Sequence, residues 1–359
     1  MNERFKNLNP ADFSRLLLAW FARHGRHDLP WQQQRTPYRV WVSEIMLQQT
    51  QVATATPYYQ RFMARFADVA LLACASLDEV LHHWSGLGYY ARARNLHRAA
   101  RQVMERHAGE IPADLDTLLS LPGIGRSTAG AILALSHDQR HPILDGNVKR
   151  VLARCFGIDG DPGSAPVLAR LWSLSDAVTP DSQVADYTQA VMDLGATVCT
   201  RSKPACGRCP VVSGCVANAT GRTAELPGAR PGRKRPARRV VWLVIRQETQ
   251  VLLQQRPPTG IWGGLWGFPE FPTPVAALRA ARERAPGTPT RPVPLPPVTH
   301  AFTHFQLEIQ PLLWDLGPDV AVLMQRATDS WYNSRAPAKV GLAAPVTALL
   351  AGLAAPGRR

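Results

Sequence analysis

A short apolar connection at residues 121–125, Leu-Pro-Gly-Ile-Gly, determines how the middle of this chain can fold. The residues before it predict a short helix, and those after it predict a second helix from about Arg126. Gly123 and Gly125 allow a sharp turn and leave the backbone amides open to another molecule. The unpaired N–H groups at the start of the second helix face the same place, which suits a phosphate. Residues 115–136 therefore indicate either a clamp for a nucleic-acid backbone or a helical hairpin that only packs.

Asp145 lies farther along the chain, between an apolar run and a segment of helical periodicity, GNVKRVLARCF. Aspartate often begins a helix, because its carboxylate accepts a hydrogen bond from a free amide of the first turn. At this position the carboxylate can also point into the cleft beside the hairpin. Lys149, one turn later, can pair with Asp145 or neutralise a phosphate.

The charge balance favours a polyanionic partner. The formal net charge is +14, which fits nucleic acid, although a ribosomal or membrane-surface protein can have the same balance. No apolar run approaches the roughly 20 residues of a membrane span, and the N-terminus lacks the apolar stretch of a secretory signal. We therefore expect no membrane attachment and a cytoplasmic, nucleoid-associated protein.

Glu44 is the exception in a predicted helix, residues 41–51 (WVSEIMLQQTQ), that is apolar on nearly every side. Such a carboxylate lies either on a narrow solvated edge or in a desolvated place that raises its pKa and suits a general acid. Gln48, just after it, and Tyr89 in the segment GLGYYARARN could fill the gap left when a base is extruded from a duplex. The alternative for Tyr89 is a ring that closes a helical turn.

Two further segments carry candidates for holding a base. The proline-broken stretch GRHDLPWQQQRTPYRVW contains Arg26 and Trp31, an arginine and an aromatic residue on irregular chain. Such a pair can hold an extruded base or simply pack. A helix predicted for residues 181–198 places Gln189 as a polar candidate that faces the same cleft.

Four cysteines follow within 17 residues, in the loop at 199–215. They are Cys199, Cys206, Cys209 and Cys215, separated in turn by six, two and five residues. Thiols spaced in this way can converge on one metal centre, and chemistry alone allows zinc or an iron-sulfur cluster. The other two cysteines, Cys74 and Cys155, are expected to be buried thiols.

Residues 229–239 (ARPGRKRPARR) predict a basic linker, because they hold six basic residues, two prolines and no acid. Beyond the linker, two apolar runs predict a pair of strands around a turn near Glu248 and Thr249.

The segment LPGIGRSTAGAIL followed by LDGNVKRVLAR resembles the helix-hairpin-helix DNA glycosylases, and specifically their adenine-removing MutY branch. The resemblance implies a mainly α catalytic region at 1–228 and a C-terminal α+β Nudix-like domain at 240–350. It also implies an activity: a monomer that hydrolyses the bond between deoxyribose and an adenine mispaired with 8-oxoguanine or guanine in duplex DNA.

The resemblance implies roles for the residues already described. Glu44 would protonate adenine at N7, and Asp145 would stabilise the sugar. Gln48 and Tyr89 would be wedges in the DNA, and the segment with Arg26 and Trp31 would line the adenine pocket. Further positions that match the family are Ser127 and Asn147 in the pocket and the four cysteines as ligands of one 4Fe-4S cluster.

Phe302-Thr303-His304 resembles the Phe-Ser-His loop by which the family's C-terminal domain senses 8-oxoguanine, with threonine in place of serine. The segment GIWGGLWGFPEF resembles the Nudix fold. The helix after it, AALRAARERAPG, lacks the glutamate-rich magnesium element of Nudix pyrophosphatases. We therefore expect the Nudix fold without its hydrolysis.

Two alternatives stay open at this point. An endonuclease III-like enzyme would remove oxidised pyrimidines and cut the strand through a lysine Schiff base. Ser127 occupies the place of that lysine, and a hydroxyl cannot form an imine, so the activity should stop at base removal. The other alternative is a non-enzymatic iron-sulfur protein that binds DNA.

Overall fold

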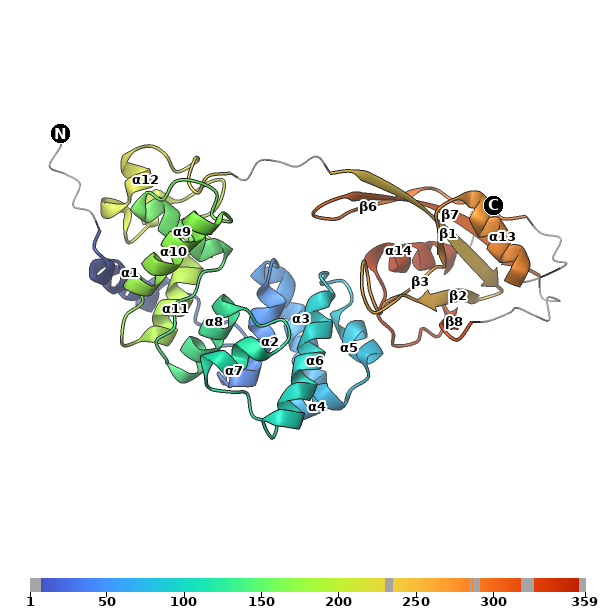
Figure 1. Cartoon of the computed structure of the whole chain (residues 1–359), viewed down its shortest axis with the longest axis horizontal. Helices are drawn as coiled ribbons and strands as arrows, with labels where there is room; N and C mark the ends of the chain where they lie inside the picture. The colour runs from blue at the N-terminus through green and yellow to red at the C-terminus, as the bar shows by residue number, and fades with distance from the viewer. Residues whose placement is uncertain (1–7, 230–234, 285, 287–290, 318–325, 355–359) are drawn as a thin grey trace. The chain divides into compact units, whose positions relative to one another are not determined.

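The computed structural model describes residues 8–229, 235–284, 286, 291–317 and 326–354. They form two compact units (Figure 1). One unit holds the described residues up to Ala73 and from Arg98 to Ala229. The other holds Cys74–His97 and the described residues from Arg235 onward. The expected order of a helical region and a C-terminal α+β domain is confirmed. Residues 230–234 of the predicted linker lie outside the described residues.

The first unit is built from helices whose first residues suit a helix start. Asn9 begins α1 by accepting a hydrogen bond from the Asp12 amide, and Pro10 fits the first turn. The elements in chain order are α1 (Pro10–His24), α2 (Pro37–Leu47), α3 (Val52–Arg65), α4 (Val69–Cys74), α7 (Leu115–Ser120), α8 (Arg126–His137), α9 (Gly146–Phe156), α10 (Ala165–Val178), α11 (Val184–Asp193), a π-turn (Leu194–Val198), short 3-10 turns (Cys206–Arg208 and Val212–Gly214) and α12 (Val216–Ala219).

The core of this unit lies where α2 packs against α8 and α11 packs against α8 and α1. Trp41, Ile132 and Val191 are buried there, one from each of α2, α8 and α11. This core fixes the backbone that carries Glu44 on α2. It also fixes the chain that leads from α8 to Asp145.

Two predicted helix boundaries are wrong. Helix α2 begins at Pro37 and ends at Leu47 instead of covering 41–51, because Thr36 caps it early and Gln49 adopts a left-handed backbone conformation (φ 57°). The helix predicted for 181–198 begins at Val184 and gives way to the π-turn at Leu194.

The second unit contains a mixed β-sheet. Its central strands, β1 and β7, are parallel and lie side by side (Figure 1). The predicted strand pair is confirmed, since β1 and β2 are antiparallel around Glu248. The strands are β1 (Ala237–Gln247), β2 (Gln250–Gln255), β3 (Trp266–Gly267), β4 (Glu270–Phe271), β5 (Val293–Pro294), β6 (Val298–Ala301), β7 (Gln306–Leu316) and β8 (Asp329–Asn333).

Helices complete this unit. Helix α13 (Pro274–Arg284) packs on β1, where Ala281 joins Leu243, Ile245 and Trp314 in a buried cluster. The others are α14 (Ala344–Ala354), α5 (Leu77–Trp84) and the first residues of α6 (Ala91–Arg106), a helix that continues into the first unit. Strand β1 begins inside the segment that was predicted to be a linker. Among the described residues, no helix has the length and apolarity needed to cross a membrane.

Candidate active site

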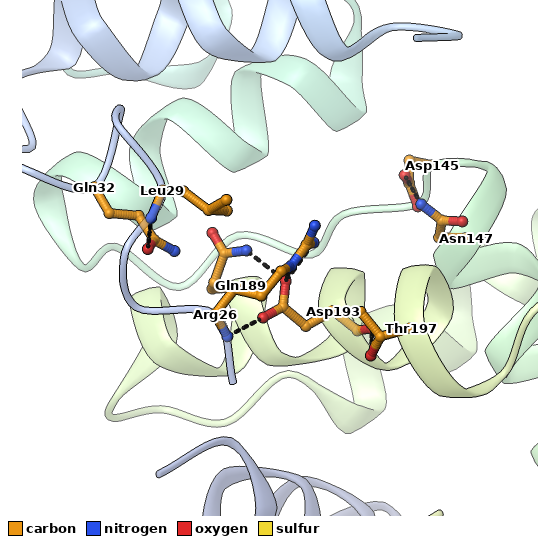
Figure 2. Close-up of polar contacts among 8 residues, drawn as sticks. All are labelled: Arg26, Leu29, Gln32, Asp145, Asn147, Gln189, Asp193 and Thr197. Atoms are coloured by element: carbon orange, nitrogen blue, oxygen red, sulfur yellow. Dashed lines mark hydrogen bonds and ion pairs between the residues drawn. The ribbon is translucent and has the colours of Figure 1, made fainter. Parts of the chain in front are cut away.

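The side chain of Asp145 is held by the first turn of the helix that it begins. It caps α9, as predicted, with Oδ1 accepting a hydrogen bond from the Val148 amide at 2.7 Å. Its Oδ2 accepts a weaker one from Asn147 Nδ2 at 3.4 Å (Figure 2). Both bonds favour the ionised carboxylate.

Glu44 lies on α2 within electrostatic reach of Asp145. Burial raises the pKa of Glu44 from 4.5 to about 8, and the negative charge of Asp145 adds to the rise. Burial also raises the pKa of Asp145, but its hydrogen bonds and the positive charge of Arg150 oppose that rise. Glu44 has no such donor among the residues that the structure describes. Burial and the charge of Asp145 thus favour the proton on Glu44, whereas the donors around Asp145 favour its ionised form.

Arg150 holds Asn147 in place. Its Nη2 donates to Asn147 Oδ1 at 2.8 Å and to the Gly195 carbonyl at 2.7 Å, and its Nε donates to the Cys199 carbonyl at 2.7 Å. Gly195 lies in the π-turn, where an added Cβ would come within 2.6 Å of Asn147 Cβ. The π-turn thus lets α9, and with it Asn147, pack closely against the following chain.

The glycine hairpin has the geometry predicted from the sequence. Gly123 has a φ of 83°, which favours glycine, and Gly125 is the N-cap of α8. Both are exposed, and apart from Gly125 and its chain neighbours no described atom lies within 4 Å of a Cβ built on Gly125. Ser127 Oγ accepts a hydrogen bond from the Leu144 amide at 3.0 Å. The first turn of α8 is therefore tied to the residue that precedes Asp145.

Arg26 and Gln189 meet at a residue that the sequence analysis missed. Arg26 donates to Asp193 through Nη2 at 2.6 Å and through its amide at 2.7 Å, and Gln189 Nε2 donates to the same carboxylate at 2.8 Å (Figure 2). Asp193 has no exposed surface. Its sequence signal was an acid four residues after Gln189 on the same helix, in an apolar stretch.

Trp31 and Gln32 lie in the irregular segment after α1. Trp31 is only 5% exposed and packs edge-on against Tyr59, with ring centroids 5.4 Å apart. Gln32 Oε1 accepts a hydrogen bond from the Leu29 amide at 3.3 Å. Its Nε2 is buried and finds no acceptor among the described residues. Gln32 was not singled out from the sequence, where it is one of three consecutive glutamines.

The other residues predicted to contact DNA lie outside this polar cluster, two in the first unit and the rest in the second. In the first unit, Gln48 Nε2 donates to Thr128 Oγ1 at 3.3 Å. Lys149 Nζ donates to the Pro162 carbonyl at 3.4 Å. In the second unit, Tyr89 is 45% exposed with a φ of 50°. Phe302-Thr303-His304 lies in the turn between β6 and β7, with Thr303 and His304 exposed.

The four cysteines of the 199–215 loop line one cavity together with Arg154, Leu194 and Val198. Arg154 is buried and donates to the Thr200 carbonyl at 2.7 Å and to Cys199 Sγ at 3.4 Å. Across the described residues, no group of three or more His, Cys, Asp or Glu side chains is arranged to hold a single metal ion.

The two cysteines outside this loop differ in exposure. Cys74 is exposed, so the prediction of a buried thiol is wrong there, because α4 is short and ends at this residue. Cys155 is buried as predicted, and its thiol hydrogen-bonds Cys215 and lowers the pKa of Cys215 to about 6.

Comparison with known proteins decides the family. Residues 42–176 match the HhH-GPD superfamily of base excision DNA repair proteins, and residues 240–352 match the NUDIX domain. The adenine DNA glycosylase of Buchnera aphidicola subsp. Acyrthosiphon pisum is 38% identical over 338 residues, which cover 94% of this chain and 96% of that protein. The chain belongs to the adenine DNA glycosylase family.

A mammalian relative and two solved structures extend the comparison. The adenine DNA glycosylase of Rattus norvegicus is 38% identical over 83% of this chain and 69% of its own length. Among solved structures, a thermostable thymine-DNA glycosylase is 26% identical, with a TM-score of 0.54 over 59% of this chain and 97% of its own. An endonuclease III–DNA complex at 20% identity (TM-score 0.50, covering 58% of this chain and 94% of its own) shares the fold. Membership makes this adenine DNA glycosylase a hydrolase of N-glycosyl bonds and excludes the non-enzymatic alternative.

Proposed function

We propose that this adenine DNA glycosylase removes adenine opposite 8-oxoguanine or guanine in duplex DNA, with Glu44 as general acid and Asp145 as the ionised partner. The observation that carries the proposal is the difference between the two carboxyl groups. Glu44 keeps its proton to about pH 8, whereas Asp145 accepts two hydrogen bonds that favour its ionised form.

This difference fits the chemistry of glycosidic cleavage. When the bond between N9 and C1′ breaks, its electron pair goes to the base and the sugar becomes cationic. A proton from Glu44 on adenine N7, as the family resemblance implies, allows the base to leave neutral. The Asp145 carboxylate stabilises the cationic sugar. Water then bonds to C1′ and loses one proton, which restores the acid.

Base removal without strand cleavage is the second part of the proposal. A lyase of the endonuclease III type needs an amine to form an imine with C1′. Here the corresponding position is Ser127, whose hydroxyl accepts a hydrogen bond from Leu144. Its role in this proposal is to position the chain before Asp145.

One set of duplexes tests both parts. The set contains A opposite 8-oxoguanine, A opposite G, and thymine glycol, each scored for strand breaks before and after alkali. We expect breaks only after alkali and only at adenine. Glu44→Gln should still bind the duplex but release adenine about 10²- to 10⁴-fold more slowly, the range for loss of a general acid. The control, Glu105→Gln, removes an exposed carboxyl of the same unit and should release adenine at the parental rate. Breaks at thymine glycol before alkali would favour the endonuclease III alternative.

We also propose that the turn at Phe302-Thr303-His304 senses 8-oxoguanine. Thr303 and His304 are exposed at the tip, and Thr303 Oγ1 lies 3.3 Å from His304 Nδ1. The threonine hydroxyl can make the contact that serine makes in the family loop. Thr303→Ala should lower the preference for 8-oxoguanine over guanine about three- to tenfold, the loss expected for one hydrogen bond. Thr303→Ser should keep it. An unchanged preference in the alanine variant would reject this role.

The loop at 199–215 is proposed to hold one 4Fe-4S cluster. Four thiolates around one cavity with apolar walls are the donor set that such a cluster requires. A zinc ion could take the same four thiolates; the cluster is preferred because the cysteine spacing resembles the iron-sulfur loop of the family. Arg154 beside Cys199 supplies a positive charge for a thiolate ligand. The purified chain should contain about four iron and four sulfide per molecule. Cys209→Ser should lose them, and Cys74→Ser should not.

A further inference from the structure

The short segment Cys74–His97 belongs to the same compact unit as the C-terminal domain, although it lies far from that domain in the sequence. Asp78 Oδ1 accepts hydrogen bonds from Gln255 Nε2 at 3.1 Å and from Trp266 Nε1 at 3.3 Å. The backbone of Leu342 makes two hydrogen bonds to this segment. Its amide donates to Ser85 Oγ at 3.2 Å, and its carbonyl accepts from the Tyr90 hydroxyl at 3.1 Å.

The packing between these parts is close as well as polar. A Cβ built on Gly341 would lie 2.6 Å from Leu81 Cβ, so the backbone at Gly341 lies directly against α5. Leu81 and Leu265 are fully buried. A contact of this kind fixes the segment on the domain.

Tyr89 lies in this segment, in the turn between α5 and α6. Arg92 holds the turn, because its Nη2 donates to the Gly88 carbonyl at 3.1 Å and its guanidinium lies over the rings of both Tyr89 and Trp84, 5.4 Å from each centroid. Tyr89 itself stays 45% exposed, as a residue that enters DNA must be.

A chain of contacts then leads from this turn to the loop at 302–304. Arg94, in the first turns of α6, donates through Nη1 to the Gly263 carbonyl at 2.8 Å. The preceding residue, Trp262, is buried and packs on Phe302, with ring centroids 5.2 Å apart. The Phe302 amide donates to the Phe305 carbonyl at 2.9 Å, which closes the turn that presents Thr303.

We propose that Tyr89 and the 302–304 loop form one DNA-reading surface held by the C-terminal domain, with Arg94 as the positioning residue that joins them. This inference rests on the proposed sensing of 8-oxoguanine. Its consequence is that recognition of the lesion base and insertion of Tyr89 into the duplex are a single event. The Nudix-like domain then supplies both the reader and the wedge.

The first test is a double-mutant cycle in the full-length protein. Its readout is the ratio of single-turnover rates for A opposite 8-oxoguanine and A opposite guanine. Arg94→Ala should lower this ratio about tenfold, the size expected when a hydrogen bond from a charged donor is lost. Arg94→Lys should restore much of it. Arg101→Ala, an exposed cation on the same helix, should leave the ratio at the parental value.

The cycle itself separates positioning from general damage. Because Arg94 acts through the loop, Arg94→Ala combined with Thr303→Ala should lower the ratio no more than the larger single effect. Tyr89→Ala combined with Arg94→Ala should also be non-additive. Fully additive effects would overturn the inference. If the parent enzyme showed no preference for 8-oxoguanine, or Thr303→Ala had no effect, the proposed function would fail instead.

A second test does not depend on catalysis. A specific protease site is placed within residues 229–239 of the full chain, which is cleaved after purification and passed through a sizing column. Because Cys74–His97 stays with the helical fragment, we expect the two fragments to elute together. Gly341→Leu, which forces a side chain into Leu81, should release the C-terminal fragment. Separation of the unmutated fragments would overturn the inference.

Discussion

The partial burial of Glu44 among apolar neighbours predicts a stability cost that depends on pH. The pKa of Glu44 is 4.5 in ordinary surroundings and about 8 in the native protein. When folding raises the pKa of an acid, the native state is most stable below the pKa of the unfolded chain, where the group is protonated in both states. Stability then falls as pH rises from the unfolded pKa through the native pKa. Each tenfold change in a protonation equilibrium corresponds to about 1.36 kcal/mol. The ionisable carboxyl therefore costs the native state about 3 kcal/mol at pH 7 and about 5 kcal/mol at pH 9, relative to pH 4.

Glu44→Gln removes this cost, because glutamine keeps the shape of the side chain and cannot ionise. Relative to the parent, the variant should therefore gain free energy of unfolding as pH rises from 4. The gain should be about 3 kcal/mol at pH 7 and about 5 kcal/mol at pH 9. Urea unfolding followed by far-UV circular dichroism at several pH values measures the difference. The control Glu105→Gln changes an exposed carboxyl and should stay within about 0.5 kcal/mol of the parent throughout. A difference that does not change with pH, or that shrinks as pH rises, would refute the assignment of a buried, protonated Glu44.

Three further outcomes are expected. The value of kcat/KM for adenine release, which reports the free enzyme, should fall as pH rises through about 8, because Glu44 loses its proton there; a plateau to pH 10 would contradict the acid role. Asp193→Ala should lower the free energy of unfolding by about 3 kcal/mol in urea titrations, since it leaves Arg26 and Gln189 without their shared buried acceptor. Gly125→Ala should leave stability within about 0.5 kcal/mol yet weaken duplex binding in a filter or anisotropy assay, whereas Gly123→Ala should also cost about 1 kcal/mol of stability because its φ is positive.

Local signals in the sequence were sufficient for the parts of the site that depend on neighbouring residues. Asp145 could be predicted as a cap because the donor, the Val148 amide, is three residues away. The turn at Gly123 follows from the properties of glycine alone. The end of α2 was misjudged because an apolar run gives no boundary when nearly every side of the helix is apolar. There, the left-handed backbone at Gln49 ends the helix.

Contacts between distant parts of the chain could not be predicted in the same way. Arg26 and Asp193 are 167 residues apart, and nothing near either one indicates its partner. The same holds for Arg94 and Gly263, which are 169 residues apart. Arg26 and Gln189 were read as DNA contacts because their chemistry allows it. Only the fold shows that both side chains bond to one buried carboxylate.

The different surroundings of the two carboxyl groups proposed to be catalytic follow from the elements that carry them. A carboxylate at a helix N-terminus receives amide donors from the backbone of its own first turn, so its ionised form is stabilised wherever the helix forms. A carboxyl in the middle of an apolar helix receives none, and burial favours its neutral form. Asp145 on the cap of α9 and Glu44 on α2 therefore differ before they approach each other. Their approach increases the difference, because the charge on Asp145 makes the proton on Glu44 still harder to remove.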